Sequence, residues 1–246
     1  MRIRAIVFGL LFLATSTVSA DNWPNWRGPT LNGVAPKGTY PVKWSATKNV
    51  AWKIKLSGKG TSTPIIWNGQ IILTSQEAGK NITLAVDRSG KTVWKTTSGG
   101  PGAKGKHRKA SGSNPSPVTD GKRIYVYFKN GDLVCLTLAG KAVWQTNLQT
   151  AWGKDTLWWD IGTSPVLSAD KVLVAVMQTG GSYVAAFNKS DGKVAWKHDR
   201  NLKAPLEAAQ SYTTPIVLKR DGVERLLVLG ADHVTAHEVA SGKELW

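Results

Sequence analysis

One group of side chains with the potential to bind a ligand is basic. Lys104, His107 and Arg108 stand with two further lysines in the glycine-containing segment 98–113. Their summed positive charge suits a polyanion, an acidic glycan or lipid headgroups, because it raises the local concentration of multivalent anions. The alternative, which the composition favours, is a solvated loop that only adds to solubility. Aromatic residues that would stack on bases are missing from this segment, so we expect no nucleic-acid partner.

A second group combines aromatic and acidic side chains. Within residues 148–162 it consists of Trp152, Asp155, Trp158, Trp159 and Asp160. Indole rings beside carboxylates suit stacking on a flat or sugar-like ligand. The same rings could equally fill the gap between the second and third repeat units described below. Both groups are therefore hypotheses for a ligand or partner surface.

Patterns typical of catalysis or metal binding are not evident. The four histidines, at 107, 198, 233 and 237, show no zinc-ligand spacing with the single cysteine or with carboxylates. His233 and His237 lie four apart on a predicted strand, where both would face one side at core or rim positions. The chain contains neither a Gly-x-Ser-x-Gly elbow nor a phosphate-binding glycine loop. We therefore predict no catalytic residue, no metal site and no bound cofactor.

The elements that position these segments come from a repeat of about 50 residues. Each copy begins with a small residue and ends with a short turn, Gly-Lys, two residues and Trp. The copies run from Ala85 to Trp94, Cys135 to Trp144, Ala186 to Trp196 and Ala236 to Trp246. Their tryptophans lie 50, 52 and 50 residues apart, and a partial copy surrounds Trp52. Repeats of this length indicate a solenoid, a propeller or an array.

Each repeat unit contains short apolar runs separated by turns. A unit begins with Ser or Thr before Pro, as at Thr63-Pro64, Ser116-Pro117, Ser164-Pro165 and Thr214-Pro215. Asn-Gly or Asp-Gly turns, such as Asn68-Gly69, then indicate hairpins between runs rich in β-branched residues. Only residues 202–210 suggest a helical turn. We therefore predict an all-β fold, a β-propeller of four-stranded antiparallel blades, because a β-sandwich would not repeat its sequence in this way.

The N-terminus has the pattern of an export signal. Arg2 and Arg4 precede a short apolar stretch, and small residues end it at Ala20. We expect a signal peptide at 1–20, a Trp- and Pro-rich arm at 21–48 and a partial propeller at 49–246. The mature chain would then be periplasmic or secreted, with no transmembrane span, and an uncleaved anchor is the alternative. The net charge of +16 and the single cysteine allow a solvated exported protein without an internal disulfide.

The copies at the two ends of the repeat array predict an open ring. The copy around Trp52 would be an outer strand without the three strands that should precede it. The copy that ends at Trp246 gives the fourth unit an outer strand of its own. Propellers commonly close by letting one terminus complete the blade of the other, which removes open edges. We therefore expect about four blades of a longer propeller of seven or eight, and a closed four-bladed ring is the alternative.

The Gly-Lys-x-x-Trp repeat resembles the tryptophan-docking motif of the pyrroloquinoline quinone (PQQ)-repeat propellers, Ala-x-Asp-x-x-Thr-Gly-Lys-x-x-Trp. The fourth copy matches best, with Ala236, Glu238, Ser241, Gly242, Lys243 and Trp246. The resemblance covers residues 49–246. It implies that the indoles dock one blade on the next, through the structural residues Trp52, Trp94, Trp144, Trp196 and Trp246. Physically, the small residue leaves room for the ring, the indole N–H needs a carbonyl, and Gly permits positive φ.

The resemblance implies two classes of function. Quinoprotein dehydrogenases of this fold bind PQQ and Ca²⁺ at the propeller axis through carboxylate and Asn ligands, and many carry two adjacent cysteines. Other members, such as the outer-membrane assembly lipoprotein, are non-catalytic scaffolds with a lipidated cysteine. This chain has one cysteine, Cys135, in an apolar run, and none at the end of the leader.

We therefore expect an exported non-catalytic binding or protein-interaction scaffold. Its partner would be an envelope or extracellular protein, or a polyanionic or glycan ligand. The alternative is a PQQ- and Ca²⁺-dependent oxidoreductase of the alcohol or sugar dehydrogenase type, with its site completed by further C-terminal blades.

Overall fold

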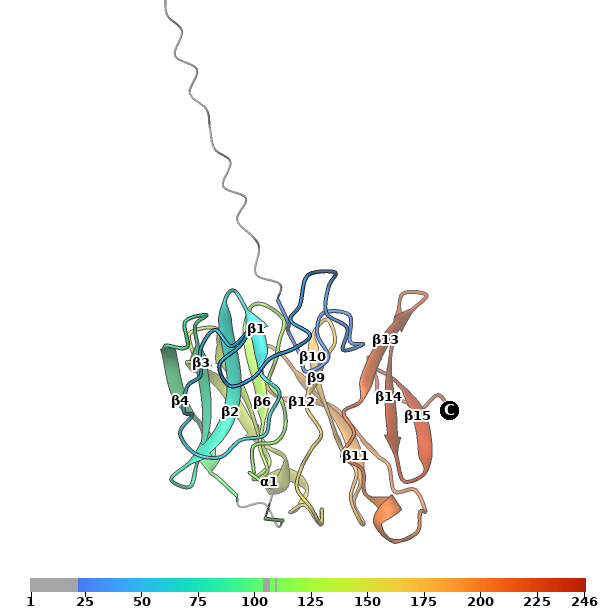
Figure 1. Cartoon of the computed structure of the whole chain (residues 1–246). Helices are drawn as coiled ribbons and strands as arrows, with labels where there is room; N and C mark the ends of the chain where they lie inside the picture. Colours follow the sequence, from blue (N-terminus) through green and yellow to red (C-terminus); the bar gives the residue numbers. More distant parts are fainter. Residues whose placement is uncertain (1–21, 104–106, 109) are drawn as a thin grey trace, which may run out of the picture.

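The computed structural model describes residues 22–103, 107–108 and 110–246, and it forms four antiparallel sheets in chain order (Figure 1). Sheet 1 consists of β1 (Ile65–Trp67), β2 (Gln70–Glu77), β3 (Lys80–Val86) and β4 (Thr92–Pro101). Sheet 2 consists of β5 (Val118–Thr119), β6 (Arg123–Tyr127), β7 (Asp132–Thr137) and β8 (Ala142–Asn147). Sheet 3 consists of β9 (Val166–Leu167), β10 (Lys171–Val176), β11 (Tyr183–Asn188) and β12 (Val194–Asp199). Sheet 4 consists of β13 (Ile216–Arg220), β14 (Val223–Gly230) and β15 (His233–Glu238).

The sheets lie side by side as blades of an unclosed ring, which confirms the predicted all-β propeller fold (Figure 1). The fourth sheet has three named strands. An isolated antiparallel β-bridge between His237 and Glu244 adds the start of a fourth strand at its outer edge. The backbone there continues the pairing, since the N–H of Ala236 donates to the carbonyl of Trp246 at 2.9 Å. The fourth repeat unit therefore starts an outer strand of its own.

Two predictions of local structure need correction. The segment 50–56 around Trp52, which we expected to be a strand, has no regular structure, because none of the described residues pairs with it as a ladder partner. A short helix that the repeat pattern did not indicate, α1 (Leu148–Trp152), begins where Asn147 accepts the N–H of Thr150 at 2.8 Å. A 3₁₀ turn, η1 (Leu206–Ala209), does form within the expected 202–210 segment.

Among the described residues, three hydrophobic clusters lie between neighbouring sheets, and a fourth packs sheet 1 against Trp52 and Ile54. Ile65 and Ile72 of sheet 1 pack with Ile124 and Val126 of sheet 2, and equivalent clusters join sheet 2 to sheet 3 and sheet 3 to sheet 4. A blade therefore buries its apolar faces against neighbouring blades or, on the free face of sheet 1, against the segment around Trp52.

The tryptophans of the repeat make the same contact at successive blades. The indole N–H of Trp94 donates to the carbonyl of Leu138 at 3.1 Å, in the turn between the third and fourth strands of the next sheet, and also to Oε1 of Gln70 at 2.9 Å. Trp144 and Trp196 donate equivalently to Lys189 and Val239, both at 2.8 Å. Trp52 makes this hydrogen bond with the Arg88 carbonyl of sheet 1, although its own segment is not a strand.

Two physical reasons require glycine in the turn of each repeat, namely its positive φ and the close approach of an indole ring. Gly192 has φ 71°, and a Cβ placed on it would come within 2.5 Å of the Trp144 ring. Gly140 and Gly242 lie under Trp94 and Trp196 in the same way. Positive φ favours glycine at these turns, and the close approach of the ring excludes any other side chain. We call these repeated contacts the indole contacts. Each consists of an indole ring on a glycine and a hydrogen bond from the indole N–H to a carbonyl of the same turn.

The Ser/Thr-Pro positions form a chain of hydrogen bonds along the inner strands. The N–H of Thr63 donates to the hydroxyl of Ser116, and the N–H of Ser116 to that of Ser164, both at 2.9 Å. The N–H of Ser164 donates to Thr214 at 3.0 Å. Each hydroxyl therefore links one blade to the preceding one, a role that the recurrence in the sequence did not reveal.

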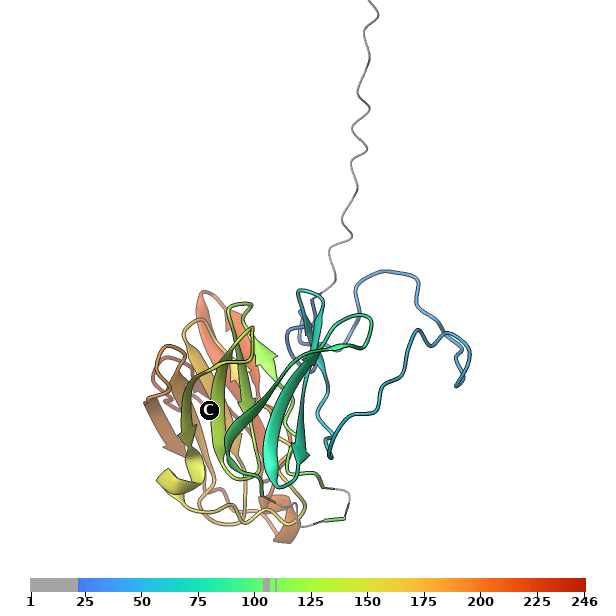
Figure 2. The same ribbon diagram turned by 90° about the vertical axis from the view of Figure 1, so that its left-hand side faces the viewer.

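The N-terminal arm lies across sheets 1 and 2. Trp23 pairs with Ile66 of β1 through two backbone hydrogen bonds of 2.8 and 2.9 Å, and the N–H of Thr119 donates to Pro24. Beyond Gly33 the chain is largely exposed up to Leu56 and loops away from the sheets (Figure 2). The proposed signal peptide at 1–20 lies outside the described residues.

Candidate functional site

The connections between blades gather on one end of the sheets, which we call the connection face. Figure 1 shows α1 on this end, opposite the N-terminal arm. Hydrogen bonds join each connection to the turn between the second and third strands, as from Gly102 N–H to Gly79 and from Leu148 N–H to Gly131. The described residues of the two candidate groups therefore occupy a single face.

Asp160 is buried and joins two connections. Its Oδ2 accepts the N–H groups of Ser111 and Gly112 at 3.2 and 3.1 Å, and the side-chain amide of Asn114 at 2.8 Å. Its Oδ1 accepts the N–H of Ile161. A carboxylate with this many donors holds its surroundings firmly, because charge-assisted hydrogen bonds are about twice as strong as neutral ones. Asp160 therefore positions the face and does not point to solvent.

A second buried charge pair supports the same connection. The ammonium of Lys129 pairs with Asp155, and both side chains are largely buried. Asp155 also accepts the side-chain amide of Gln149 at 3.0 Å and the N–H of Leu157 at 3.2 Å. The segment 155–160 is thus fixed at both ends by a buried carboxylate.

Trp152, at the end of α1, packs between blades. Its ring lies 4.9 Å from that of Tyr183 and 5.9 Å from that of Phe187, and the ammonium of Lys197 lies 5.8 Å from its centroid. Burial, helped by nearby Asp155, raises the pKa of Tyr183, so its hydroxyl stays protonated. Trp152 therefore fills the gap between two blades, as the second of the two interpretations of this group predicts.

Trp158 and Trp159 are the aromatic residues of the group that face solvent. They are 47% and 45% exposed. The Trp159 indole N–H donates to Glu207 in η1, and the ring meets His107 edge-on at a centroid distance of 5.1 Å. The connection face therefore brings His107 of the basic group next to Trp159 of the aromatic group.

The basic group is only partly described. Arg108 is exposed, and its carbonyl accepts the ammonium of Lys59 at 2.8 Å. Lys104 lies outside the described residues. The described part of this loop thus supplies an exposed Arg108 in the position next to His107, which contacts Trp159.

A cavity of about 600 Å³ opens along the inner edge of the sheets. It is bordered by the hydroxyl residues of the Ser/Thr-Pro chain, by Asn114 and by Trp26 and Arg27 of the arm. Ca²⁺ in proteins is held by several oxygen ligands, usually including carboxylates. None of the described residues that line this cavity carries a carboxylate, so they do not supply the ligand set that PQQ with Ca²⁺ would require.

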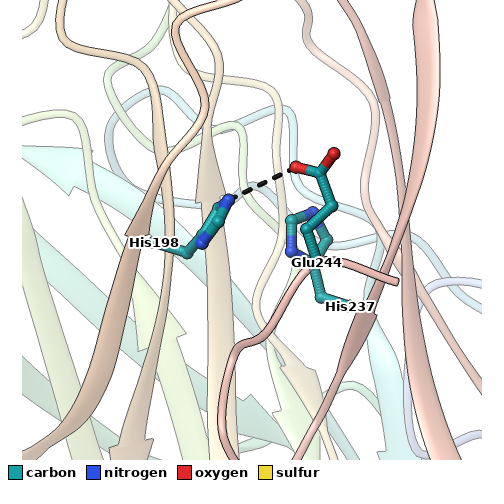
Figure 3. A group of neighbouring side chains, drawn as sticks. All are labelled: His198, His237 and Glu244. Carbon is teal, nitrogen blue, oxygen red and sulfur yellow. Dashed lines mark hydrogen bonds and ion pairs between the residues drawn. The ribbon is translucent and has the colours of Figure 1, made fainter. Parts of the chain in front are cut away.

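A further group of polar residues, which the sequence analysis did not single out, lies at the seam of sheets 3 and 4. His198 of β12, His237 of β15 and Glu244 point toward one another (Figure 3). Their nearest ligand-type atoms all lie within 4.8 Å of one another. His233 of the same strand is exposed, whereas His237 is fully buried, so the pair divides between rim and core.

His237 is held by a chain of hydrogen bonds. Its Nε2 lies 2.9 Å from the hydroxyl of Thr235, which accepts a hydrogen bond from Nε of Arg200 at 2.8 Å. Arg200 is itself buried and donates to the carbonyls of Gly230, Val228 and His233. Burial lowers the pKa of His237, so its imidazole is neutral at neutral pH.

Comparison with protein families gives one match. A family model described as outer membrane protein assembly factor BamB matches residues 34–179 and 78–246. No curated protein matches the sequence.

Solved structures show the same fold. BamB from Moraxella catarrhalis is 18% identical with a TM-score of 0.54, over 80% of this chain and 50% of that one. The quinohemoprotein alcohol dehydrogenase from Comamonas testosteroni is 13% identical with a TM-score of 0.62, over 94% and 41%. A europium-containing methanol dehydrogenase is 14% identical with a TM-score of 0.51, over 74% and 40%. The chain thus spans half or less of these proteins, and the identities establish the fold alone.

Proposed function

The chain belongs to the PQQ-repeat family described as outer membrane protein assembly factor BamB, and we propose that it is a non-catalytic scaffold that binds a protein partner through its connection face. The observation that carries this proposal is the pair of half-exposed indoles, Trp158 and Trp159, on a segment fixed by buried Asp155 and Asp160. Tryptophan is enriched among the residues that dominate binding energy at interfaces. A surface that is already ordered loses little entropy when a partner binds.

The chemistry of the face suggests the kind of partner. The exposed Arg108 and the net charge of +16 favour a partner with acidic groups around an apolar patch. Opposite charges speed the encounter, and the indoles then supply the apolar contact. A polyanion would use the charge alone, whereas a glycan would also stack on the indoles.

The site of action follows from the leader sequence. Export by a signal peptide at 1–20 would place the propeller in the periplasm or outside the cell. In the described part of the chain, no helix is long and apolar enough to cross a membrane. An envelope protein is accordingly the partner class that we propose.

A binding experiment with variants tests this function. Trp158→Ala combined with Trp159→Ala removes both exposed rings, whereas Trp44→Ala removes a ring that is 70% exposed on the arm. Cross-linking in envelope extract, followed by mass spectrometry, should identify a protein that wild type and Trp44→Ala capture and the double variant does not. Equal capture by all three, at equal thermal stability, would contradict the proposal.

A second measurement addresses the oxidoreductase alternative. Purified chain is mixed with PQQ and Ca²⁺, and cofactor absorbance and dye-linked alcohol or sugar oxidation are followed. The scaffold proposal predicts neither retained absorbance nor turnover. Bound, redox-active PQQ would replace it with the dehydrogenase alternative.

A further inference from the structure

The seam between sheets 3 and 4 brings together two imidazoles and a carboxylate from three separate segments. His198 comes from the outer strand of sheet 3, His237 from β15 and Glu244 from the segment that pairs with β15 (Figure 3). Nε2 of His198 lies 3.3 Å from Oε2 of Glu244, and the two imidazole rings meet edge-on at 4.9 Å. The three residues therefore form a cluster that spans two blades.

The surroundings of His237 resemble the support that metal-binding histidines receive. Such a histidine commonly has one ring nitrogen hydrogen-bonded to a protein group while the other binds the ion. Here Nε2 contacts the Thr235 hydroxyl at 2.9 Å, and Arg200 holds that hydroxyl. Nδ1 has only a 3.4 Å contact with the carbonyl of Gly242. This longer contact is the one that an ion could replace at little loss.

We propose that His198, His237 and Glu244 bind a divalent transition-metal ion, with Zn²⁺ as the best fit, and that the ion braces sheet 3 against sheet 4. Two imidazoles and one carboxylate form a donor set that zinc uses, with bonds of about 2.0–2.2 Å. Tetrahedral coordination at that length places ligand atoms about 3.4 Å apart. His198 and Glu244 already lie 3.3 Å apart, and the separations of up to 4.8 Å within the group must close by up to about 1.4 Å. Ca²⁺ and Mg²⁺ prefer oxygen ligands alone and do not fit.

Solvent access and nearby charges determine how an ion would enter this site and how strongly it would bind. The side chains of His198 and Glu244 are 33% and 37% exposed, so an ion can enter from solvent and keep a water as its fourth ligand. The positive charge of Arg200 opposes a cation nearby, although its donors are directed at carbonyls and at Thr235. Glu244, as the only anionic ligand, must offset this charge, and its loss should weaken binding strongly.

Metal titration of the tag-free, EDTA-treated chain tests the site. Zn²⁺ is titrated by calorimetry, and Co²⁺ is used as a probe whose visible absorption reports nitrogen and oxygen ligands. We expect one equivalent to bind to wild type and to His233→Gln, a control that alters a histidine outside the cluster. Glu244→Gln and His198→Gln should bind at least tenfold more weakly.

Thermal unfolding supplies the second readout. A ligand that binds only the folded state raises the unfolding temperature. Saturating Zn²⁺ should therefore raise it for wild type and His233→Gln, and not for Glu244→Gln or His198→Gln. Absence of one-equivalent binding, equal affinity in all four proteins, or saturation without a rise in wild type would each overturn the proposal. The variants change half-exposed side chains, so folding of each is checked by its metal-free unfolding curve.

Discussion

At the turns between third and fourth strands, successive blades are joined by one contact that recurs, whereas on the connection face every junction is different. The indole contacts use an indole ring, a glycine and a backbone carbonyl at each blade. On the connection face, Asp132 accepts the N–H of Gly100 at the first seam and Asp160 joins the first two connections. At the third seam buried Arg200 reaches the carbonyls of sheet 4. The recurring contact builds the ring, and the variable face can differ from blade to blade without disturbing it.

The contrast between the two kinds of junction indicates which positions tolerate substitution. An acceptor that is a backbone carbonyl is available whatever residue stands there, as Arg88, Leu138, Lys189 and Val239 show. A contact through Asp160 or Arg200 exists only with that side chain. Loops on a rigid scaffold commonly carry binding residues. We therefore expect binding specificity to depend on individual side chains of the connection face.

Removing an indole should have the largest effect. Trp144→Ala opens a cavity between sheets 2 and 3 and should lower the free energy of unfolding by about 3–5 kcal/mol. Urea unfolding measures this value. Trp44→Ala, which removes an exposed ring, should change it by no more than about 0.5 kcal/mol. An unchanged unfolding curve for Trp144→Ala would break the argument that the indole contacts hold the blades together.

The glycine under the indole gives the next effect. Gly192→Ala places a methyl group 2.5 Å from the Trp144 ring at φ 71°, and overpacking of this kind costs about 1–3 kcal/mol beyond the strain of positive φ. Gly222→Ala is the matched control, because Gly222 has φ 78° with nothing within 4 Å. Thermal unfolding of both separates the two terms. Equal losses would show that conformation alone selects glycine.

On the connection face the effect should be local. Asp160→Asn exchanges a carboxylate oxygen that accepts three N–H donors for a group that cannot accept them all. The expected loss is about 1–3 kcal/mol, confined to the segment 110–114. Hydrogen exchange should rise at Ser111 and Gly112 and stay unchanged at β7. Exchange that rises equally in both places would make Asp160 a global support.

The smallest effect concerns the small residue of the repeat. Cys135 is paired across the sheet with Trp144, and burial raises the pKa of its thiol to about 11. At pH 8 the folded protein should therefore resist alkylation by iodoacetamide, since the thiolate is the nucleophile. Trp144→Ala should speed labelling by opening the seam. Rapid labelling of wild type would place Cys135 outside the packed core.

The blades could be predicted because their signals are local. Hairpin turns, β-branched runs and the Gly-Lys-x-x-Trp spacing are each complete within one repeat, and their fourfold recurrence fixes the type of fold. The segment around Trp52 shows the limit of this reasoning. It carries the docking residue of an outer strand, yet a strand needs a ladder partner, and none of the described residues supplies one beside it.

The candidate surface could be predicted only in part. Trp158 and Trp159 lie exposed on the connection face, while Trp152 of the same group packs on Tyr183 and Phe187. The sequence pattern does not distinguish these indoles, because exposure depends on which blade covers each ring. The carboxylate of Asp160, expected beside a ligand, instead accepts backbone N–H groups.

The repeat, the strand order and the docking residues could be predicted from the amino-acid sequence, since they depend on contacts that recur at a fixed period. Which side chains meet across the seams depends on the packing of one blade on the next. His198 lies two residues after Trp196, and Glu244 lies two residues before Trp246. The two residues are 46 positions apart, so no short-range spacing in the sequence connects them. They become neighbours only when the outer strand of one sheet packs on the next. Packing between blades, rather than position along the chain, therefore brings the residues of the proposed metal site together.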